Sequence, residues 1–117
     1  MKSYEFKIKE NLGDTLFFVE TNDENKVVSR FTDFFWTPYK IQEIIDGVEK
    51  SRLSEDEDSF EWSSEDVYLR SNKYGLFFVD LISKRADRGS GKHDYYLSHS
   101  DFLQFLEDFK SFVKDNS

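Results

Sequence analysis

The two histidines are the first residues to consider for catalysis, because imidazole is the side chain that ordinarily titrates near neutral pH. They are His93 and His99, and they flank a short segment expected to be a strand. A strand would hold them at opposite ends, too far apart to share one metal ion. We therefore interpret both as surface histidines. A small hydrolase that pairs one of them with a nearby carboxylate is the alternative, which loss of activity on replacing both by alanine would support.

Carboxylates are concentrated between Glu55 and Asp66, where seven of twelve residues are acidic. The first four are consecutive, and hard oxygen ligands of this kind suit calcium or magnesium. The run lacks the alternating ligands, central glycine and terminal glutamate of an EF-hand loop, so we expect no specific metal site and no cofactor. Paired acid–base carboxylates need a cleft that separates their pKa values, whereas we expect this run to be exposed.

A short glycine-rich sequence, Gly89-Ser90-Gly91-Lys92, resembles the end of a phosphate-binding loop. Ala86 and His93 replace the first glycine and the hydroxyl residue of that motif, and the apolar run that follows is too short for the required helix. We interpret Lys84 to Lys92 as a basic loop. It is solvated, pairs with the acidic segment, or touches an anionic group on a partner.

The composition indicates a single folded domain, residues 1–117, with an aromatic-rich core supplied by 13 Phe, 6 Tyr and 2 Trp. The absence of cysteine excludes disulfides and thiolate chemistry and fits a reducing compartment. The first residues alternate charged and apolar side chains and lack the apolar core of a secretory signal. We expect a cytoplasmic protein with no membrane segment.

Alternation of apolar and charged residues predicts two N-terminal strands joined as a hairpin. The first strand covers about Ser3 to Glu10, Leu12 to Asp14 form the turn, and Thr15 to Glu20 form the second strand. The segment Lys26 to Arg30 is either a third strand or the start of an irregular aromatic stretch.

Two helices are predicted from apolar residues at helical spacing. Thr37-Pro38 starts the first, because threonine caps free amide groups and proline is tolerated at the first helical position. This helix runs to about Lys50. Ser100 is predicted to cap the second helix. The apolar stripe of that helix contains Phe102, Phe105, Leu106, Phe109, Phe112 and Val113.

Between the helices the sequence predicts a meander. Ser54 to Asp58 is an exposed connector before it. The further segments are strands around Phe60 to Trp62, at Val67 to Arg70 and at Leu76 to Ile82, a turn at Ser71 to Gly75, a polar loop at Ser83 to Lys92 and a short strand at Asp94 to Leu97. The expected fold is α+β, a mostly antiparallel sheet of about five or six strands with two amphipathic helices packed on one face.

The charge pattern favours binding over catalysis. With 24 acidic against 16 basic residues and a net charge of −8, we expect a basic protein partner and no nucleic acid. The alternative is that acidic charge simply keeps a small protein soluble. Aromatic rings inside the acidic run suit an apolar anchor, and the alternative is burial as strand residues. The predicted partner-binding residues are Glu55, Asp56, Glu57, Asp58, Phe60, Glu61, Trp62, Glu65 and Asp66.

Short motifs at the two ends of the chain resemble the YacL-like family of small acidic bacterial proteins. The motifs are Tyr4-Glu5-Phe6, Tyr95-Tyr96, Asp101-Phe102-Leu103-Gln104 and Phe112-Val113. The order of elements is also similar. The resemblance implies a fold and an intracellular homo-oligomeric or scaffold role, with no catalytic residues to carry over. Arg85 and Arg88 depart from the acidic middle of that family.

In size, acidity and lack of catalytic groups the chain is also similar to bacterial immunity proteins, which bind a toxin and block its active site. Many such toxins are basic nucleases, so a carboxylate-rich surface can stand in for phosphates and accelerate association. We therefore predict a non-enzymatic immunity protein whose acidic segment occupies the basic cleft of a nuclease toxin. The YacL-like role is the alternative, and a homodimer is left open.

Overall fold

The protein is built from antiparallel strands with helices on one side. The computed structural model describes residues 4–21, 26–32, 35–53, 55, 60–86 and 94–116. The elements are β1 (Tyr4–Asn11), β2 (Asp14–Thr21), α1 (Lys26–Phe31), α2 (Pro38–Ser51), β3 (Phe60–Ser63), β4 (Val67–Asn72), β5 (Gly75–Asp80), α3 (Leu81–Ala86), β6 (Asp94–Leu97) and α4 (His99–Asp115). The predicted α+β class, with antiparallel strands and two amphipathic helices, is confirmed.

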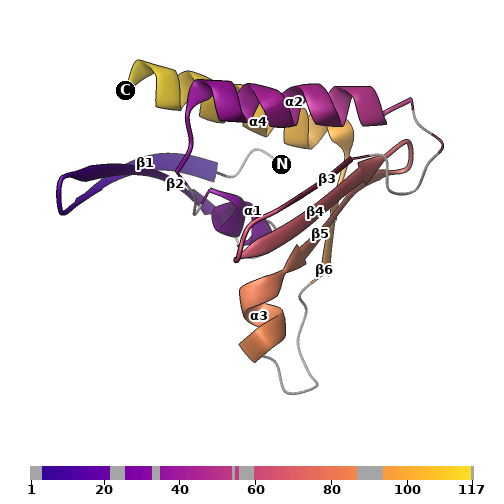
Figure 1. Ribbon diagram of the computed structural model, residues 1–117, viewed down its shortest axis with the longest axis horizontal. Helices are drawn as coiled ribbons and strands as arrows, with labels where there is room; N and C mark the ends of the chain where they lie inside the picture. Colours follow the sequence, from indigo (N-terminus) through magenta and orange to yellow (C-terminus); the bar gives the residue numbers. More distant parts are fainter. Residues whose placement is uncertain are drawn as a thin grey trace.

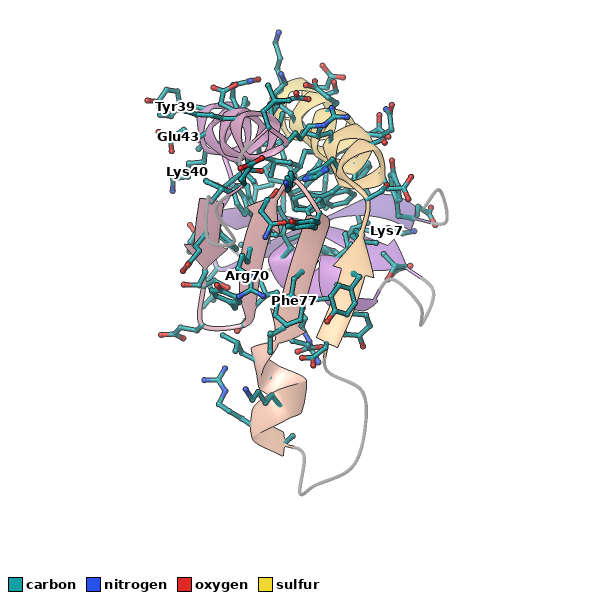
Figure 2. All side chains as sticks on the ribbon, turned by 90° about the vertical axis from the view of Figure 1, so that its right-hand side faces the viewer. Lys7, Tyr39, Lys40, Glu43, Arg70 and Phe77 are labelled. Carbon is teal, nitrogen blue, oxygen red and sulfur yellow. The ribbon has the colours of Figure 1, made fainter. Side chains whose placement is uncertain are left out.

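The strands divide between two sheets. β1 and β2 form a two-stranded sheet, and the other strands form a four-stranded sheet in the order β3-β4-β5-β6. Figure 1 shows α2 and α4 side by side above both sheets, with the hairpin and the four-stranded sheet beneath different parts of the helix pair. In Figure 2 the other face of the four-stranded sheet is turned to the viewer, and none of the described helices lies over it.

The N-terminal hairpin follows its apolar alternation, as predicted. β1 pairs with β2 from Tyr4 opposite Thr21 to Asn11 opposite Asp14. One face of the hairpin packs on α4, where the Phe6 ring stacks on Phe112 with the ring centroids 5.2 Å apart. The turn residues Leu12 and Gly13 have φ angles of 53° and 88°. Two positive φ angles are what a type I′ hairpin turn requires.

Residues Lys26–Phe31 form a helix, so both the strand and the irregular stretch considered for this segment are wrong. Val27, Val28 and Phe31 are buried together. Burial of these three side chains on one side of a helix outweighs the strand preference of valine. The helix is followed by Thr32, whose hydroxyl donates to the Ser29 carbonyl oxygen at 3.0 Å.

The start of α2 matches the capping signal in the sequence. The Thr37 hydroxyl oxygen accepts a hydrogen bond from the Lys40 amide at 3.2 Å, and Pro38 occupies the first turn. The apolar face is buried as its spacing predicts. Its members are Ile41, Ile44, Ile45 and Val48. Of the connector predicted after α2, only Glu55 lies within the described residues.

Ser98, and not Ser100, caps α4. The Ser98 hydroxyl oxygen accepts from the Asp101 amide at 3.1 Å. A capping oxygen reaches the amide three residues further along, and Ser100 already lies inside the helix. The predicted stripe is buried except for Phe112, which is half-buried.

β5 ends two residues earlier than predicted, because Leu81–Ala86 form α3. Leu81 and Ile82 therefore do not belong to the strand, and the segment up to Ala86 is not a loop. At the boundary the buried Asp80 carboxylate pairs with the Arg30 Nε of α1 at 3.4 Å. The Leu81 amide donates to the Asp66 carbonyl oxygen at 2.9 Å, which continues the β4–β5 pairing one residue beyond Val67 and Asp80 before the helix begins. Residues 87–92 of the predicted loop lie outside the described part of the chain.

The core is rich in aromatic rings, and α4 contacts both sheets. Its Phe105 lies 5.9 Å from Phe6 of the hairpin, and its Phe102 lies 5.1 Å from Phe78 of the four-stranded sheet, measured between ring centroids. Trp36, ahead of α2, donates its indole N–H to the Phe31 carbonyl oxygen at 3.1 Å. One continuous core therefore fixes both sheets relative to the helices.

Candidate protein-interaction surface

Three of the predicted acidic residues lie on β3, an edge strand of the four-stranded sheet, or in the turn after it: Glu61, Glu65 and Asp66. Glu61 and Glu65 are exposed, and Asp66 is partly buried. Glu55, also exposed, has its carboxylate 3.5 Å from the Lys73 ammonium of the β4–β5 turn. We call Glu55, Glu61 and Glu65 the acidic edge. The remaining predicted acids, Asp56, Glu57 and Asp58, lie outside the described residues.

The turn between β3 and β4 has a fixed backbone. The Ser64 hydroxyl oxygen accepts hydrogen bonds from the amides of Asp66 and Val67 at 3.1 and 3.3 Å. The Ser64 amide donates in turn to the Val67 carbonyl oxygen at 2.9 Å. These bonds hold Glu65 between ordered neighbours, so its carboxylate projects from a rigid support.

Arg85, which belongs to the basic segment, contacts the β3–β4 turn that carries Glu65. Its Nε donates to the Leu81 carbonyl oxygen at 3.2 Å, and its guanidinium also donates to the carbonyl oxygen of Glu65. Because Arg85 binds the backbone oxygen, the Glu65 carboxylate takes no part in this contact. Lys84 is exposed, whereas Arg88 and Lys92 lie outside the described residues.

The two aromatic rings of the acidic run face the core. The Trp62 ring centroid lies 5.0 Å from that of Phe31 and 5.3 Å from that of Trp36. Phe60 packs beneath Gly47 of α2, so closely that a side chain at position 47 would overlap its ring. Both rings are partly buried and hold β3 against the helices, in line with the alternative of burial as strand residues.

Aromatic surface available to a partner lies instead on the face of the four-stranded sheet turned away from α2 and α4, which we call the open face (Figure 2). Strand register assigns its residues, because directly opposed residues share a face and successive residues alternate. The members are Glu61, Ser63, Tyr68, Arg70, Phe77, Val79, Asp94 and Tyr96. Of these residues, Val79 is only 9% exposed.

One row of side chains crosses all four strands of the open face. Glu61 is opposite Arg70, Arg70 is opposite Phe77, and Phe77 is opposite Tyr96. The guanidinium carbon of Arg70 lies 5.1 Å from the centre of the Phe77 ring, and the Phe77 and Tyr96 centroids are 5.2 Å apart. Figure 2 shows Arg70 and Phe77 on the outer side of the sheet. Arg70 lies on an inner strand and Tyr96 on the edge strand β6, and both are residue types enriched in interface hot spots.

A shallow cavity of about 220 Å³ lies at the end of the open face near the β4–β5 turn. Its wall includes Arg70, Tyr74, Phe77 and Tyr96. Tyr74 and Tyr96 are 77% and 75% exposed. Sequence reasoning missed this surface, although alternation had already placed these residues opposite the core-facing ones in their strands.

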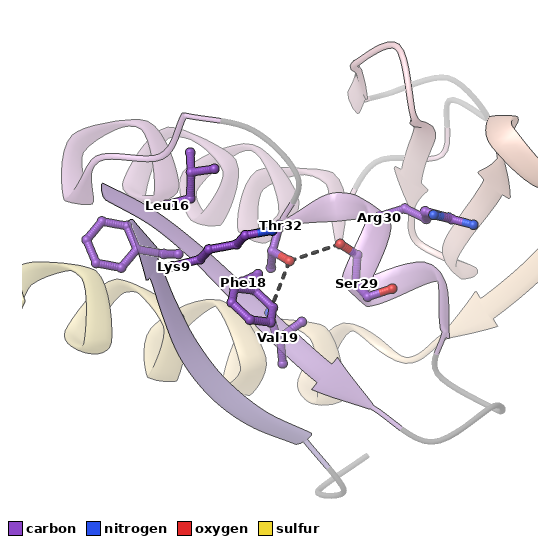
Figure 3. A pocket seen from close by; sticks show the side chains of 8 residues that line it. Lys9, Leu16, Phe18, Val19, Ser29, Arg30 and Thr32 are labelled. Atoms are coloured by element: carbon purple, nitrogen blue, oxygen red, sulfur yellow. Dashed lines mark hydrogen bonds between the residues drawn. The ribbon is translucent and has the colours of Figure 1, made fainter. Parts of the chain in front are cut away.

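A second cavity, of about 340 Å³, lies between the hairpin and α1. Figure 3 shows Phe18 and Val19 in its wall, Lys9 lying across it and Arg30 pointing away from it. The Thr32 hydroxyl accepts from the Val19 amide at 3.3 Å in addition to donating to Ser29. Arg30 and Thr32 therefore join α1 to the two sheets and are not arranged as a catalytic pair.

His99 is the first residue of α4 and is partly buried. Its Nε2 is buried without a hydrogen-bond partner among the described residues. His93 lies outside them. Within the described ranges, no group of three or more histidines or carboxylates is placed to hold a metal ion. No described helix is both long enough and apolar enough to cross a bilayer.

Comparisons of the chain with protein-family models, with curated proteins and with solved structures found no match. The similarity to the YacL-like family and to immunity proteins therefore stays a prediction from sequence.

Proposed function

We propose that the protein is a non-enzymatic binding protein that recognises a basic protein partner through its acidic edge. In its most specific form, it is a bacterial immunity protein that blocks the basic active-site cleft of a nuclease toxin. The observation that carries the proposal is the rigid turn at Ser64, which supports the exposed Glu65 beside the edge strand that carries Glu61.

Rigid carboxylates suit this role for two reasons. A side chain on a fixed backbone loses less conformational entropy on binding than one on a flexible segment. An acidic surface on a chain of net charge −8 also attracts a basic partner over long distances and raises the association rate. Both effects act without chemistry at any residue.

Tyr74 takes over the role of apolar contact in this proposal. It lies in the β4–β5 turn and is largely exposed. The Lys73 ammonium lies 5.1 Å from the centre of the Tyr74 ring and 3.5 Å from the Glu55 carboxylate. An exposed ring beside the acidic edge gives the partner an aromatic contact that Phe60 and Trp62 do not offer.

The test uses the C-terminal domain of the protein encoded by the adjacent upstream gene. We expect this domain to stop growth when it is expressed alone and to be harmless when this chain is co-expressed. The dissociation constant of the purified pair should rise steeply with salt. Glu65→Lys should weaken binding by about tenfold or more and reduce the salt dependence.

Glu43→Lys is the matched control, because Glu43 is an exposed carboxylate on α2, away from the acidic edge (Figure 2). It changes the net charge equally and should alter binding much less than Glu65→Lys. Equal effects of the two variants would refute the acidic edge as the binding surface. A domain that is harmless on its own would refute the immunity function.

A further inference from the structure

We infer that the open face pairs with the open face of a second copy of this chain. A twofold interface must be self-complementary, because each residue that contacts a second residue is itself contacted by the copy of that residue. The row of residues that crosses the four strands has this property.

Consider a twofold axis that runs parallel to the strands and between β4 and β5. It places β3 over β6 of the second copy and β4 over β5. Glu61 then faces Tyr96 of the other copy, whose hydroxyl can donate to the carboxylate. Arg70 faces Phe77, so the guanidinium that already lies on its own Phe77 ring meets a second ring.

The next row on the open face is also complementary under this axis. Ser63, Tyr68, Val79 and Asp94 lie opposite one another across the four strands. The axis brings the exposed Ser63 to the exposed Asp94 of the other copy, whereas Val79 is only 9% exposed and adds little contact surface. The pair of Ser63 and Asp94 joins a hydroxyl to a carboxylate.

Charge selects this axis over the other twofold axis in the plane of the interface. An axis perpendicular to the strands would place each β3 over β3 of the other copy. Glu61, the exposed carboxylate that β3 carries on the open face, would then lie close to Glu61 of the other copy, and like charges across an interface are strongly unfavourable. The axis parallel to the strands instead puts the two acidic edges on opposite sides of the dimer. Glu55 and Glu65 stay outside the paired rows, where they remain available to the partner proposed above.

The test measures self-association of the purified chain by sedimentation velocity, with no partner present. We expect the 14.0 kDa chain to form a dimer at micromolar concentration. Tyr96→Glu should raise the dimer dissociation constant by about tenfold or more, because it places a carboxylate opposite Glu61 of the other copy. Adding Glu61→Lys to that variant should restore most of the affinity.

This rescue is specific to the proposed pairing. In one chain, positions 61 and 96 lie on opposite edge strands, three strand spacings or about 14 Å apart, so they do not pair within the monomer. Tyr39→Glu is the matched control, because Tyr39 is 74% exposed but lies on α2 (Figure 2). It should leave the dimer intact.

A monomeric wild-type chain at 100-fold higher concentration would overturn the inference, as would equal effects of Tyr39→Glu and Tyr96→Glu. So would a Glu61→Lys, Tyr96→Glu double variant that dimerises no better than Tyr96→Glu. Because the measurement uses this chain alone, its outcome is independent of whether the proposed toxin partner exists.

Discussion

Both faces of the four-stranded sheet carry aromatic rings, but the described helices cover only one face. On the covered face, Phe78 and Tyr95 are buried beneath the helices, and the neighbouring Ser71 is hydrogen-bonded to Ser51 of α2. On the open face, Tyr96 projects into solvent and Phe77 is half-buried. An aromatic side chain in a strand therefore does not by itself indicate core. Its contribution to the stability of the fold depends on whether another element packs against that face.

The largest expected difference is between Phe78 and its neighbour Phe77, which point to opposite faces of β5. Phe78→Ala removes a fully buried ring and leaves a cavity, so the free energy of unfolding should fall by about 3–5 kcal/mol. Phe77→Ala should lower it by about 1 kcal/mol. Denaturant unfolding, at a protein concentration low enough to keep the chain monomeric, measures both. Similar losses for the two variants would contradict the assignment of covered and open faces.

Gly47 tests how tightly the covered face is packed. A side chain there would overlap the Phe60 ring, although alanine is otherwise the better helix former by about 1 kcal/mol. Overpacking should outweigh that gain, so we expect Gly47→Ala to lower the free energy of unfolding by about 1–2 kcal/mol.

The smaller side chain of Phe60→Leu should recover part of the Gly47→Ala loss in the double variant. Glu43→Ala, at an exposed position of the same helix, is the control and should change stability little. A Gly47→Ala protein that is more stable than the wild type would show that the Phe60 ring does not fill the space beside α2.

The third prediction compares two tyrosines: Tyr4, which lies under the helices, and Tyr96, which lies on the open face. Burial, and then the hydrogen bond that the Tyr4 hydroxyl donates to the Asp108 carboxylate, raise the pKa of Tyr4 well above its usual value. Tyr4→Phe should therefore lower the free energy of unfolding by about 1 kcal/mol near neutral pH, whereas Tyr96→Phe should leave it unchanged.

The pH dependence separates the hydrogen bond of Tyr4 from simple packing. An unfolded tyrosine has a pKa of about 10, so the contribution of Tyr4 is complete below that pH. It is lost as the pH rises above 10 and approaches the raised pKa of the folded state. Unfolding curves between pH 8 and 12 should show a steeper alkaline loss for the wild type than for Tyr4→Phe. Parallel curves would refute the pKa shift.

Much of this fold follows from local pattern. The alternation from Tyr4 onward predicts the hairpin, and the capping signal at Thr37 predicts the start of α2, because both depend on neighbours in sequence. The segment Lys26–Phe31 was missed because its helical form depends on burying three side chains against distant elements. The short helix after Asp80 likewise follows a buried ion pair with Arg30, a contact across 50 residues of chain.

The candidate surface was harder to predict than the fold. Charge identified the acidic edge, and the Ser64 turn adds the rigidity that sequence alone could only suggest. Trp62 stood out by its acidic neighbours, yet its environment is set by Phe31 and Trp36 from another part of the chain. The open face depends on which side of the sheet the helices cover, which no single strand encodes.

The smallest expected effect concerns Leu12, where an apolar side chain has no covering element at all. It is 98% exposed at the hairpin tip with a φ of 53°, a left-handed conformation that leucine adopts at some energetic cost and asparagine tolerates better. Leu12→Asn loses no packing, so it should raise the free energy of unfolding by about 0.5 kcal/mol. Leu53→Asn is the matched control, because Leu53 is 90% exposed without a positive φ. A gain at position 12 alone would show that backbone conformation controls stability where burial contributes nothing, while equal changes at both positions would assign the effect to side-chain polarity.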